Sequence, residues 1–434
     1  MHSTADASRL ASLLLPRVPH GYASVVAPRD PGASALSVRH RISGPGHFVL
    51  AAALLAAAGA GAETPGPAPD RLTLGGEVSL AIAPRDPTFF NYTDYEYNPL
   101  RLARFGLSGV FRVHDRLALL GEVRSDNLGT PRAHALYLRV RPWPGRAFDL
   151  QAGLIPPVFG AFARRSYATD NFLIGYPLAY QYLTAIRSDA LPATAGDLVN
   201  MRGRGWRPRF PIGSQEERPG LPLVNALRWD TGVQARAGSE RLELLAAYTT
   251  GTLSSPRVRD DNGGRQVCAR VAARPIVGLL LGASAARGAY LGRESTEGLA
   301  FDADTFLQRA YGLDVEYSRD YWLVRAEGVW NGWDVPSIGG PWVSGPLRAR
   351  ALSLEGRYKL WPGLYAAARV DHLGFNRMQG MSVTWDAPVL RVEAGGGYHI
   401  RRHVLVKAVY QHNRRDNGGM RSLDVAAGQL LLWF

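Results

Sequence analysis

The sequence predicts an all-β protein, a transmembrane antiparallel β-barrel of about 16 strands, with roughly 14 to 18 as the range. Three observations predict this fold class. Apolar and polar residues alternate with a period of two, short and long connections alternate along the chain, and a short apolar segment lies near the N-terminus. Outside that segment, no apolar run reaches the length of about 18 residues that a transmembrane helix needs.

The alternation begins at Leu72 and recurs to the end of the chain. In Leu72–Ile82 the even positions are mostly apolar and the odd positions are polar or small. Successive side chains of a strand point to opposite faces, so one face meets an apolar environment and the other meets water. We expect strands near 72–83, 99–113, 117–126, 132–141, 147–155, 223–237, 241–250, 265–273, 278–290, 304–317, 321–331, 346–358, 363–373, 387–399, 403–412 and 421–434.

The connections between these strands alternate in length. The short ones are 114–116, 142–146, 238–240, 274–277, 318–320, 359–362 and 400–402. The long ones are 84–98, 156–222, 251–264, 291–303, 332–345, 374–386 and 413–420, and 127–131 is the short exception among them. Short periplasmic turns and long extracellular loops are typical of outer-membrane barrels, whereas a soluble sandwich has no reason to alternate in this way.

A membrane explains both patterns. In lipid every backbone N–H and C=O must be paired internally, and closing the sheet removes its unpaired edges. About 16 strands enclose a lumen too wide for side chains to fill, so water enters and inward charges need no buried partner. Aromatic residues gather at the strand ends and predict two girdles at the membrane boundaries. The set near the short turns is Trp143, Tyr317, Tyr321, Trp322, Trp361 and Tyr398, and the set near the long loops is Tyr248, Tyr290, Trp330, Trp333, Trp385 and Tyr410.

The N-terminal part has the composition of an export signal. The basic residues Arg39–Arg41 precede an apolar stretch, Phe48–Ala58, and then the small residues Ala60 and Ala62. We interpret 38–62 as a signal peptide cleaved after Ala62, 63–70 as a Pro-rich lead and 71–434 as the barrel. Residues 1–37 are interpreted as an upstream extension from a misassigned start, with an ordered segment as the alternative. The lone Cys268 can form no internal disulfide, which suits an exported chain.

The C-terminal strand carries the residues on which a family resemblance depends. Leu430, Leu432 and the terminal Phe434 form an alternating apolar end that resembles the signal read by the barrel-assembly machinery. With the strand pattern, residues 71–434 resemble the Gram-negative outer-membrane porin superfamily. Gly153–Gly160 is faintly similar to the phosphate-selective porin group, without the lysine cluster of that group.

The resemblance implies a passive diffusion channel for small hydrophilic solutes in the bacterial outer membrane. It implies outer-membrane lipids and lipopolysaccharide as partners and leaves a homotrimer open. In general porins the loop at the place of 156–222 folds into the barrel and narrows it. The loop carries paired arginines and an arginine-rich run, which are Arg164, Arg165, Arg202, Arg204, Arg207 and Arg209.

Guanidinium groups match carboxylates and phosphates, and rings of arginine make anion-selective pores. We therefore hypothesise an anion preference, which the formal net charge of +13 favours. The alternative is an external loop whose charges are solvated or contact lipopolysaccharide phosphates. Secondary candidates for lumen charges are Arg139, Arg141, Arg325 and Arg369.

Other function classes have weaker support in the sequence. No Gly-x-Ser-x-Gly or His-Glu-x-x-His motif occurs, so we expect no enzyme, no metal and no cofactor. The arginines are spread over alternating strands, so nucleic-acid binding is disfavoured. Two alternatives stay open: an outer-membrane barrel enzyme of the lipase or protease type, and a structural or adhesive barrel.

Overall fold

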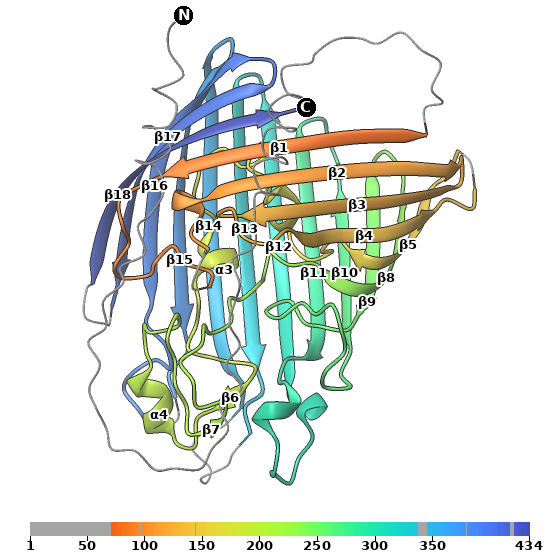
Figure 1. Cartoon of the computed structure of the whole chain (residues 1–434). Coiled ribbons are helices and arrows are strands. Elements are labelled where there is room, and N and C mark those ends of the chain that lie inside the picture. Colours follow the sequence, from red (N-terminus) through yellow and green to blue (C-terminus); the bar gives the residue numbers. More distant parts are fainter. Residues whose placement is uncertain (1–70, 95–96, 144, 337–344, 379, 417–420) are drawn as a thin grey trace, which may run out of the picture. The chain divides into compact units, whose positions relative to one another are not determined.

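The computed structural model describes residues 71–434 except 95–96, 144, 337–344, 379 and 417–420. The described residues form a closed antiparallel barrel of sixteen strands (Figure 1). The predicted upstream extension (1–37), signal peptide (38–62, with Ala60 and Ala62) and Pro-rich lead (63–70) lie outside the described residues. Among the described residues, no helix is long and apolar enough to cross a membrane.

Strand β1 (Leu72–Ile82) closes the barrel by pairing with β18 (Ser422–Trp433). The other barrel strands are β2 (Ala103–His114), β3 (Leu117–Asp126), β4 (Arg132–Val140), β5 (Ala147–Ile155), β8 (Asp230–Gly238), β9 (Leu242–Thr249), β10 (Gln266–Ala273), β11 (Leu279–Ala289), β12 (Leu307–Arg319), β13 (Trp322–Trp333), β14 (Leu347–Trp361), β15 (Leu364–Phe375), β16 (Val389–Arg401) and β17 (Val404–Arg415). The predicted fold class is therefore confirmed, strand number included.

Two predicted strands begin too early. We expected a strand from residue 99, but Pro99–Arg101 form a 3-10 helix and β2 begins at Ala103. We also expected a strand from residue 223, but β8 begins at Asp230. Leu223 and Val224 are buried, and the carbonyl oxygen of Leu223 accepts hydrogen bonds from Gln308 and Asn331 on the barrel wall. These residues therefore end the long connection between β5 and β8, because their apolar side chains pack inside the barrel.

The outer face of the barrel is apolar and the inner face is polar. In β9, Leu242, Leu244 and Tyr248 are exposed, while Glu243 and Thr249 are buried. This arrangement inverts that of a water-soluble protein, because the exposed side is the one that faces lipid. The alternation predicted from the sequence thus corresponds to lipid on one side and the barrel interior on the other.

The aromatic girdles are only partly as predicted. All six residues of the short-turn set are exposed and lie at or near strand ends. On the long-loop side Tyr248, Trp330 and Tyr410 are exposed, but Tyr290, Trp333 and Trp385 are at most 1% exposed. These last three residues point inward, because an apolar core inside the barrel offers them packing partners.

The C-terminal Phe434 is paired with the first strand. Its backbone N–H donates to Gly76 O at 3.1 Å, and the N–H of Gly76 donates to Phe434 O at 3.2 Å. Its ring lies so close to Gly76 that a Cβ there would be 2.4 Å from a ring carbon. The terminal residue therefore helps to close the barrel, and its role as an assembly signal stays a prediction.

The two faces of one strand should differ in their tolerance of charge. Leu107 is exposed on the outer face near the middle of β2, and its neighbour Ser108 is exposed on the inner face. We expect Leu107→Arg to lower the free energy of unfolding by about 2–4 kcal/mol in a bilayer, because the charge must enter lipid. Ser108→Arg is the matched control and should cost far less. Urea unfolding in lipid vesicles measures both, and equal losses would contradict the assignment of faces.

Candidate functional site

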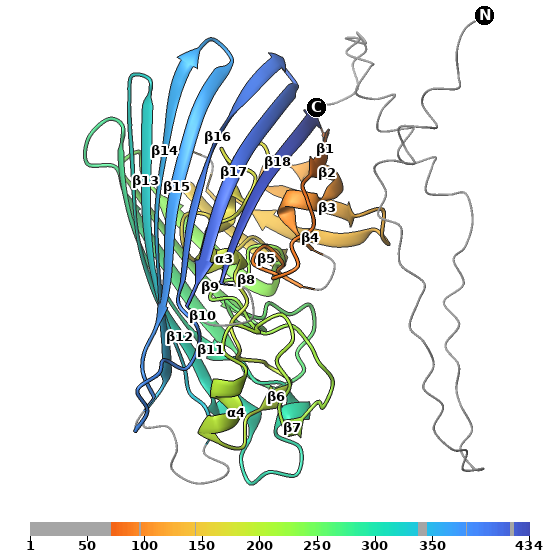
Figure 2. The same ribbon diagram turned by 90° about the vertical axis from the view of Figure 1, so that its left-hand side faces the viewer.

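The long connection between β5 and β8 folds into the barrel. It contains the short elements η2 (Ala163–Arg165), α3 (Leu178–Gln181), β6 (Ala190–Leu191), α4 (Ala195–Asn200) and β7 (Ile212–Gly213). Both views place α3 between β13–β17 and β1–β4 (Figure 2). The connection begins on the wall, where Gly160 N donates to Ser284 Oγ of β11 at 3.1 Å. We call residues 156–229 the lumen loop.

The lumen loop crosses the barrel from one wall to the other. Tyr180 donates its hydroxyl to Glu327 Oε1 of β13 at 2.6 Å. Tyr167 donates to Glu122 Oε2 of β3 at 2.7 Å. Seven strands lie between β3 and β13 in each direction round the closed barrel, so the two glutamates stand on opposite walls. A solute that passes through must therefore go round this loop.

Buried charges of the wall anchor the loop backbone. Arg391 on β16 donates to Tyr176 O at 3.0 Å and to Phe90 O at 2.8 Å. Lys407 on β17 donates to three loop carbonyls, those of Ala168, Asn171 and Leu173. Glu393 on β16 accepts from Gly175 N at 2.8 Å. A buried charge is costly unless it is hydrogen-bonded, and here the loop supplies the partners.

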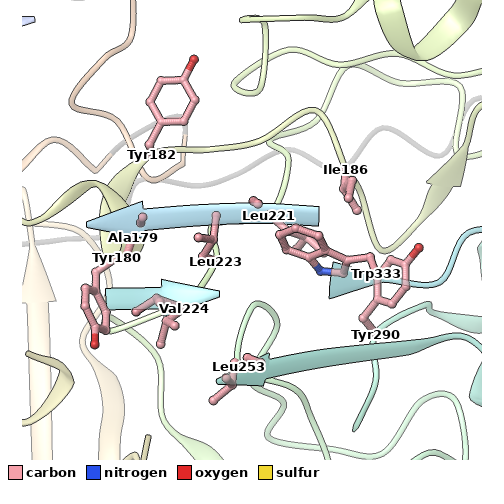
Figure 3. Packing of buried hydrophobic residues seen from close by; sticks show 14 of the residues in the cluster. Ala179, Tyr180, Tyr182, Ile186, Leu221, Leu223, Val224, Leu253, Tyr290 and Trp333 are labelled. Atoms are coloured by element: carbon pink, nitrogen blue, oxygen red, sulfur yellow. The ribbon is translucent and has the colours of Figure 1, made fainter. Parts of the chain in front are cut away.

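Apolar contacts fill the part of the lumen beside β9–β16. Loop residues pack against wall residues in one cluster (Figure 3). The loop contributes Tyr180, Tyr182, Ile186, Leu221, Leu223 and Val224, and Tyr290 and Trp333 are inward residues of the opposing segments. Because this cluster is buried, the loop is held to that side and the open space lies on the other.

The open space is a cavity of about 660 Å³ at the long-loop end of β2–β5, enclosed by their wall, the lumen loop and neighbouring connections such as the one after β9. Its ionisable lining consists of five arginines, four acids and one histidine. These residues are Arg104, Arg124, Arg132, Arg218 and Arg228 with Asp94, Asp126, Asp189, Glu294 and His134. The cavity is therefore of mixed charge, with a small positive excess.

Arg124, on the cavity wall, has unused hydrogen-bonding capacity. Its side chain is 6% exposed, its Nε donates to Glu122, and its guanidinium lies 4.5 Å from the ring centre of Tyr167. Among the described residues neither Nη atom of Arg124 has a hydrogen-bond partner, and the same is true of Thr93 Oγ1 and His134 Nε2. All three residues line the cavity. Their unpartnered atoms are buried beside the cavity where the loop approaches β3.

Arg104 differs from Arg124 because its bonds are satisfied. Its Nε donates to Asp126 Oδ1 at 2.7 Å, and its Nη2 donates to the hydroxyl of Tyr97 at 2.8 Å. The adjacent positive charges were not singled out from the sequence. The alternating pattern could have identified them. In two consecutive strands the inward-facing positions carry charged or polar residues, which are Arg104, Ser108, Arg112, Glu122 and Arg124.

The structure does not bring the six arginines predicted for the loop together. Arg165 lies inside the barrel, half-buried, and donates to Glu316 Oε2 at 2.8 Å. Arg202 donates to Thr384 Oγ1, Arg207 pairs with Glu217, and Arg204 and Arg209 are exposed. These four follow α4, at the long-loop end of the barrel (Figure 1). The side chain of Arg164 lies outside what the structure describes.

The four predicted lumen charges also have different surroundings. Arg369 is 1% exposed and bonds to Glu355, Asp371 and Glu393. Arg325 pairs with Glu316 and Glu355. Arg139 is half-buried on the inner face and Arg141 is exposed beyond the end of β4. The first two belong to a buried ion network.

Two buried carboxylates hold the outer half of the lumen loop. Burial alone would raise the pKa of Asp189, but hydrogen bonds and ion pairs with Arg187 and Arg218 outweigh burial and lower that pKa. Asp386, in the connection after β15, accepts from Ala185 N and Gly203 N at 2.8 Å each. Burial raises the pKa of Asp386. Among the described residues, no group of three His, Cys, Asp or Glu side chains is placed to hold a metal.

Solved structures of outer-membrane porins have the same fold. An anion-selective porin from Comamonas acidovorans is 11% identical with a TM-score of 0.51, and the match covers 84% of this chain and 99% of that one. OmpF of Salmonella typhi, in complex with daunomycin, is 12% identical with a TM-score of 0.50, covering 84% and 97%. The sequence matches no protein-family model and no curated protein.

At these identities the likeness establishes the fold alone. The predicted resemblance to porins is thereby confirmed as a resemblance of fold. The predicted location in the bacterial outer membrane agrees with this fold and with the apolar outer face of the barrel.

Proposed function

We propose that this chain is an outer-membrane porin, a passive diffusion channel for small hydrophilic solutes with a preference for anions. The observation that carries the proposal is the lumen loop, which spans opposite walls and leaves a charged cavity of about 660 Å³ on one side. A barrel that only provided structure or adhesion would have no need of an ion-lined space beside a fixed internal loop.

The anion preference rests on the lining of that cavity. Asp126 neutralises Arg104, and Arg218 is paired with Asp189 and Glu294. Arg124 pairs with Glu122 through Nε, but both of its Nη atoms have no hydrogen-bond partner among the described residues. Guanidinium donates to carboxylate and phosphate oxygens in a planar geometry, so a passing anion gains hydrogen bonds that a cation does not. The Comamonas porin is described as anion-selective, but at 11% identity it carries only the fold.

The remaining expectations are part of the same proposal. The channel is not an enzyme and holds no cofactor, and it is inserted by the barrel-assembly machinery. A homotrimer is the assembly expected from porins in general, and light scattering in detergent would measure it.

Single-channel recording tests the proposal. We expect the unmodified protein to form steady ohmic channels in planar bilayers. In a tenfold KCl gradient, the sign of the reversal potential shows which ion the channel prefers. A reversal potential with the same sign as the equilibrium potential of chloride supports an anion pore. A protein that inserts but carries no current would reject the porin proposal, and a cation preference would reject the anion proposal alone.

A further inference from the structure

The charged residues around the cavity beside the lumen loop divide into a paired group and an unpaired group. In the paired group, Arg104 binds Asp126 at 2.7 Å. Arg218 binds Asp189 at 2.9 Å and Glu294 at 3.6 Å. Three of the four acids that line the cavity are therefore neutralised by arginines of the same lining.

The unpaired group consists of Arg132 and Arg228. Both side chains are exposed and line the cavity. Among the described residues, neither guanidinium group forms an ion pair or a hydrogen bond. Two solvated arginines alone would indicate only a positive potential, so the kind of anion they receive depends on what lies next to them.

An indole ring lies next to these arginines. Trp229 is half-buried and lines the cavity, and its ring centre is 4.8 Å from that of His134 and 6.3 Å from that of Tyr137. Both of these residues belong to β4, whereas Trp229 directly precedes β8. Because β5 lies between β4 and β8 in the barrel (Figure 1), the indole extends across the end of β5.

The two arginines come from the strands that flank β5. Arg132 stands two residues before His134 on β4, and Arg228 directly precedes Trp229. The lining near the indole also includes Leu154, the second-last residue of β5. The cavity thus combines two uncommitted positive charges with an aromatic ring at one place on its wall.

Hydrogen bonds on both sides fix the segment that carries Trp229. Before it, Asn225 Oδ1 accepts from the backbone N–H of Arg228 at 3.1 Å. After it, the carboxylate of Asp230 accepts from the backbone N–H of Gly251 at 2.9 Å. The site is therefore formed before a ligand arrives, which lowers the entropic cost of binding.

Lipid does not account for this tryptophan. Girdle aromatics lie on the outer face at the membrane boundary, whereas Trp229 contacts His134 inside the barrel. A ring at the wall of a wet lumen can pack against a solute that has a ring of its own, and such pairs gain stability beyond the area that they bury. Guanidinium groups donate to carboxylate and phosphate oxygens.

We propose that Arg132, Arg228 and Trp229 form a subsite for organic anions that carry an aromatic ring. The ring packs against the indole of Trp229, and oxygens of the anionic group accept hydrogen bonds from Arg132 and Arg228. A cavity of about 660 Å³ has room for such a solute. The inference rests on the proposed function, because a site in the lumen requires that solutes enter it, and it narrows the solute class from anions in general to aromatic anions.

Titration of the folded protein in detergent by saturation-transfer NMR measures binding directly. The probes are benzoate, cyclohexanecarboxylate, which has the same charge without an aromatic ring, and benzyl alcohol, which has the ring without the charge. We expect benzoate to bind severalfold more tightly than either of the others. Adenosine monophosphate is the phosphate probe, and tighter binding of it than of benzoate would assign the subsite to nucleoside phosphates within the same chemistry.

Substitutions separate the two parts of the subsite. Arg132→Gln combined with Arg228→Gln should weaken benzoate binding about tenfold, because charge-assisted hydrogen bonds are lost. Both arginines are exposed, so this double variant keeps the packing of the barrel. Trp229→Leu should lower the affinity for benzoate to that for cyclohexanecarboxylate. Arg414→Gln and Trp330→Leu are matched controls on exposed residues that do not line the cavity, and neither should change an affinity.

Conductance distinguishes this inference from the porin proposal. A barrel that conducts ions but binds benzoate no more tightly than cyclohexanecarboxylate overturns the subsite and leaves the porin proposal standing. Equal binding of benzoate by the double arginine variant and the unmodified protein overturns it as well. Benzoate binding that depends on Arg132, Arg228 and Trp229 in a barrel without current supports the subsite and rejects the porin proposal.

Discussion

Replacing the lumen loop by a tight turn should increase the conductance of a single channel about twofold or more, because the loop occupies part of a wide lumen. Ile155 at the end of β5 pairs with Asp230 at the start of β8. Residues 156–229 can therefore be replaced by a short glycine-rich hairpin connection without changing the register of the barrel. Conductance in planar bilayers at fixed salt measures the effect.

The barrel should fold without this loop because its closure does not depend on it. Each strand pairs with its neighbours through backbone hydrogen bonds, and β5 pairs directly with β8. Arg391, Glu393 and Lys407 would lose their loop partners, but water entering the lumen can replace them. Circular dichroism of the variant in detergent should keep the β signal.

A single substitution tests whether the contact between the lumen loop and β3 holds the loop in place. Tyr167→Phe removes the hydroxyl that donates to Glu122 and keeps the ring under Arg124. We expect more frequent conductance fluctuations, because the loop loses one of its bonds to the wall of β3. Thr305→Val is the control, since the exposed Thr305 hydroxyl donates to Asp302 O and, among the described residues, to no atom of the lumen loop. An unchanged conductance after loop replacement would mean that solutes do not pass beside this loop.

The strands could be predicted because lipid and water impose opposite requirements on alternate residues. That constraint acts on each residue separately. The sequence alone therefore predicts that Leu313 and Val315 face outward and that Asp314 faces inward. Closure followed from the same argument, since an open edge is not tolerated in lipid. The start of β8 was misplaced where this constraint ends and apolar residues such as Leu223 pack inside the barrel.

The contents of the lumen could not be predicted in the same way. The positions of Arg391 and Lys407 in the alternating pattern show that both face inward. The pattern does not show that carbonyl groups of the lumen loop accept their hydrogen bonds. The lumen loop has no periodic pattern, so its arginines could be counted but not placed along the pore. Contacts such as Tyr167 with Glu122 join residues far apart in the chain, and a single sequence does not record them.

The substitution Arg124→Gln should reduce the anion-to-cation permeability ratio severalfold. Arg124 lines the cavity beside the loop crossing, and a permeating ion there lies well within the Debye length of about 8–10 Å. At an effective dielectric near 20, a unit charge at 4 Å contributes at most about 4 kcal/mol, and a fraction of that shifts the ratio severalfold. Reversal potentials in a salt gradient measure the ratio.

Removing this one charge also exposes another of opposite sign. Glu122 pairs with Arg124 and accepts from Tyr167, so in the variant its carboxylate faces the passage with only the tyrosine as partner. The net charge of the Arg124–Glu122 pair then changes from zero to −1. This change favours cations, which is why a neutral substitution is sufficient and a charge reversal is not required.

The arginine run after α4 provides the comparison that locates selectivity. Replacing Arg202, Arg204, Arg207 and Arg209 by glutamine removes four charges, but these arginines are not among the residues that line the cavity. We expect this fourfold variant to shift the reversal potential less than Arg124→Gln does alone, because charges in the open mouth are screened by salt. A larger shift from the fourfold variant would place the selectivity filter in the outer part of the loop, as its arginine content alone suggests.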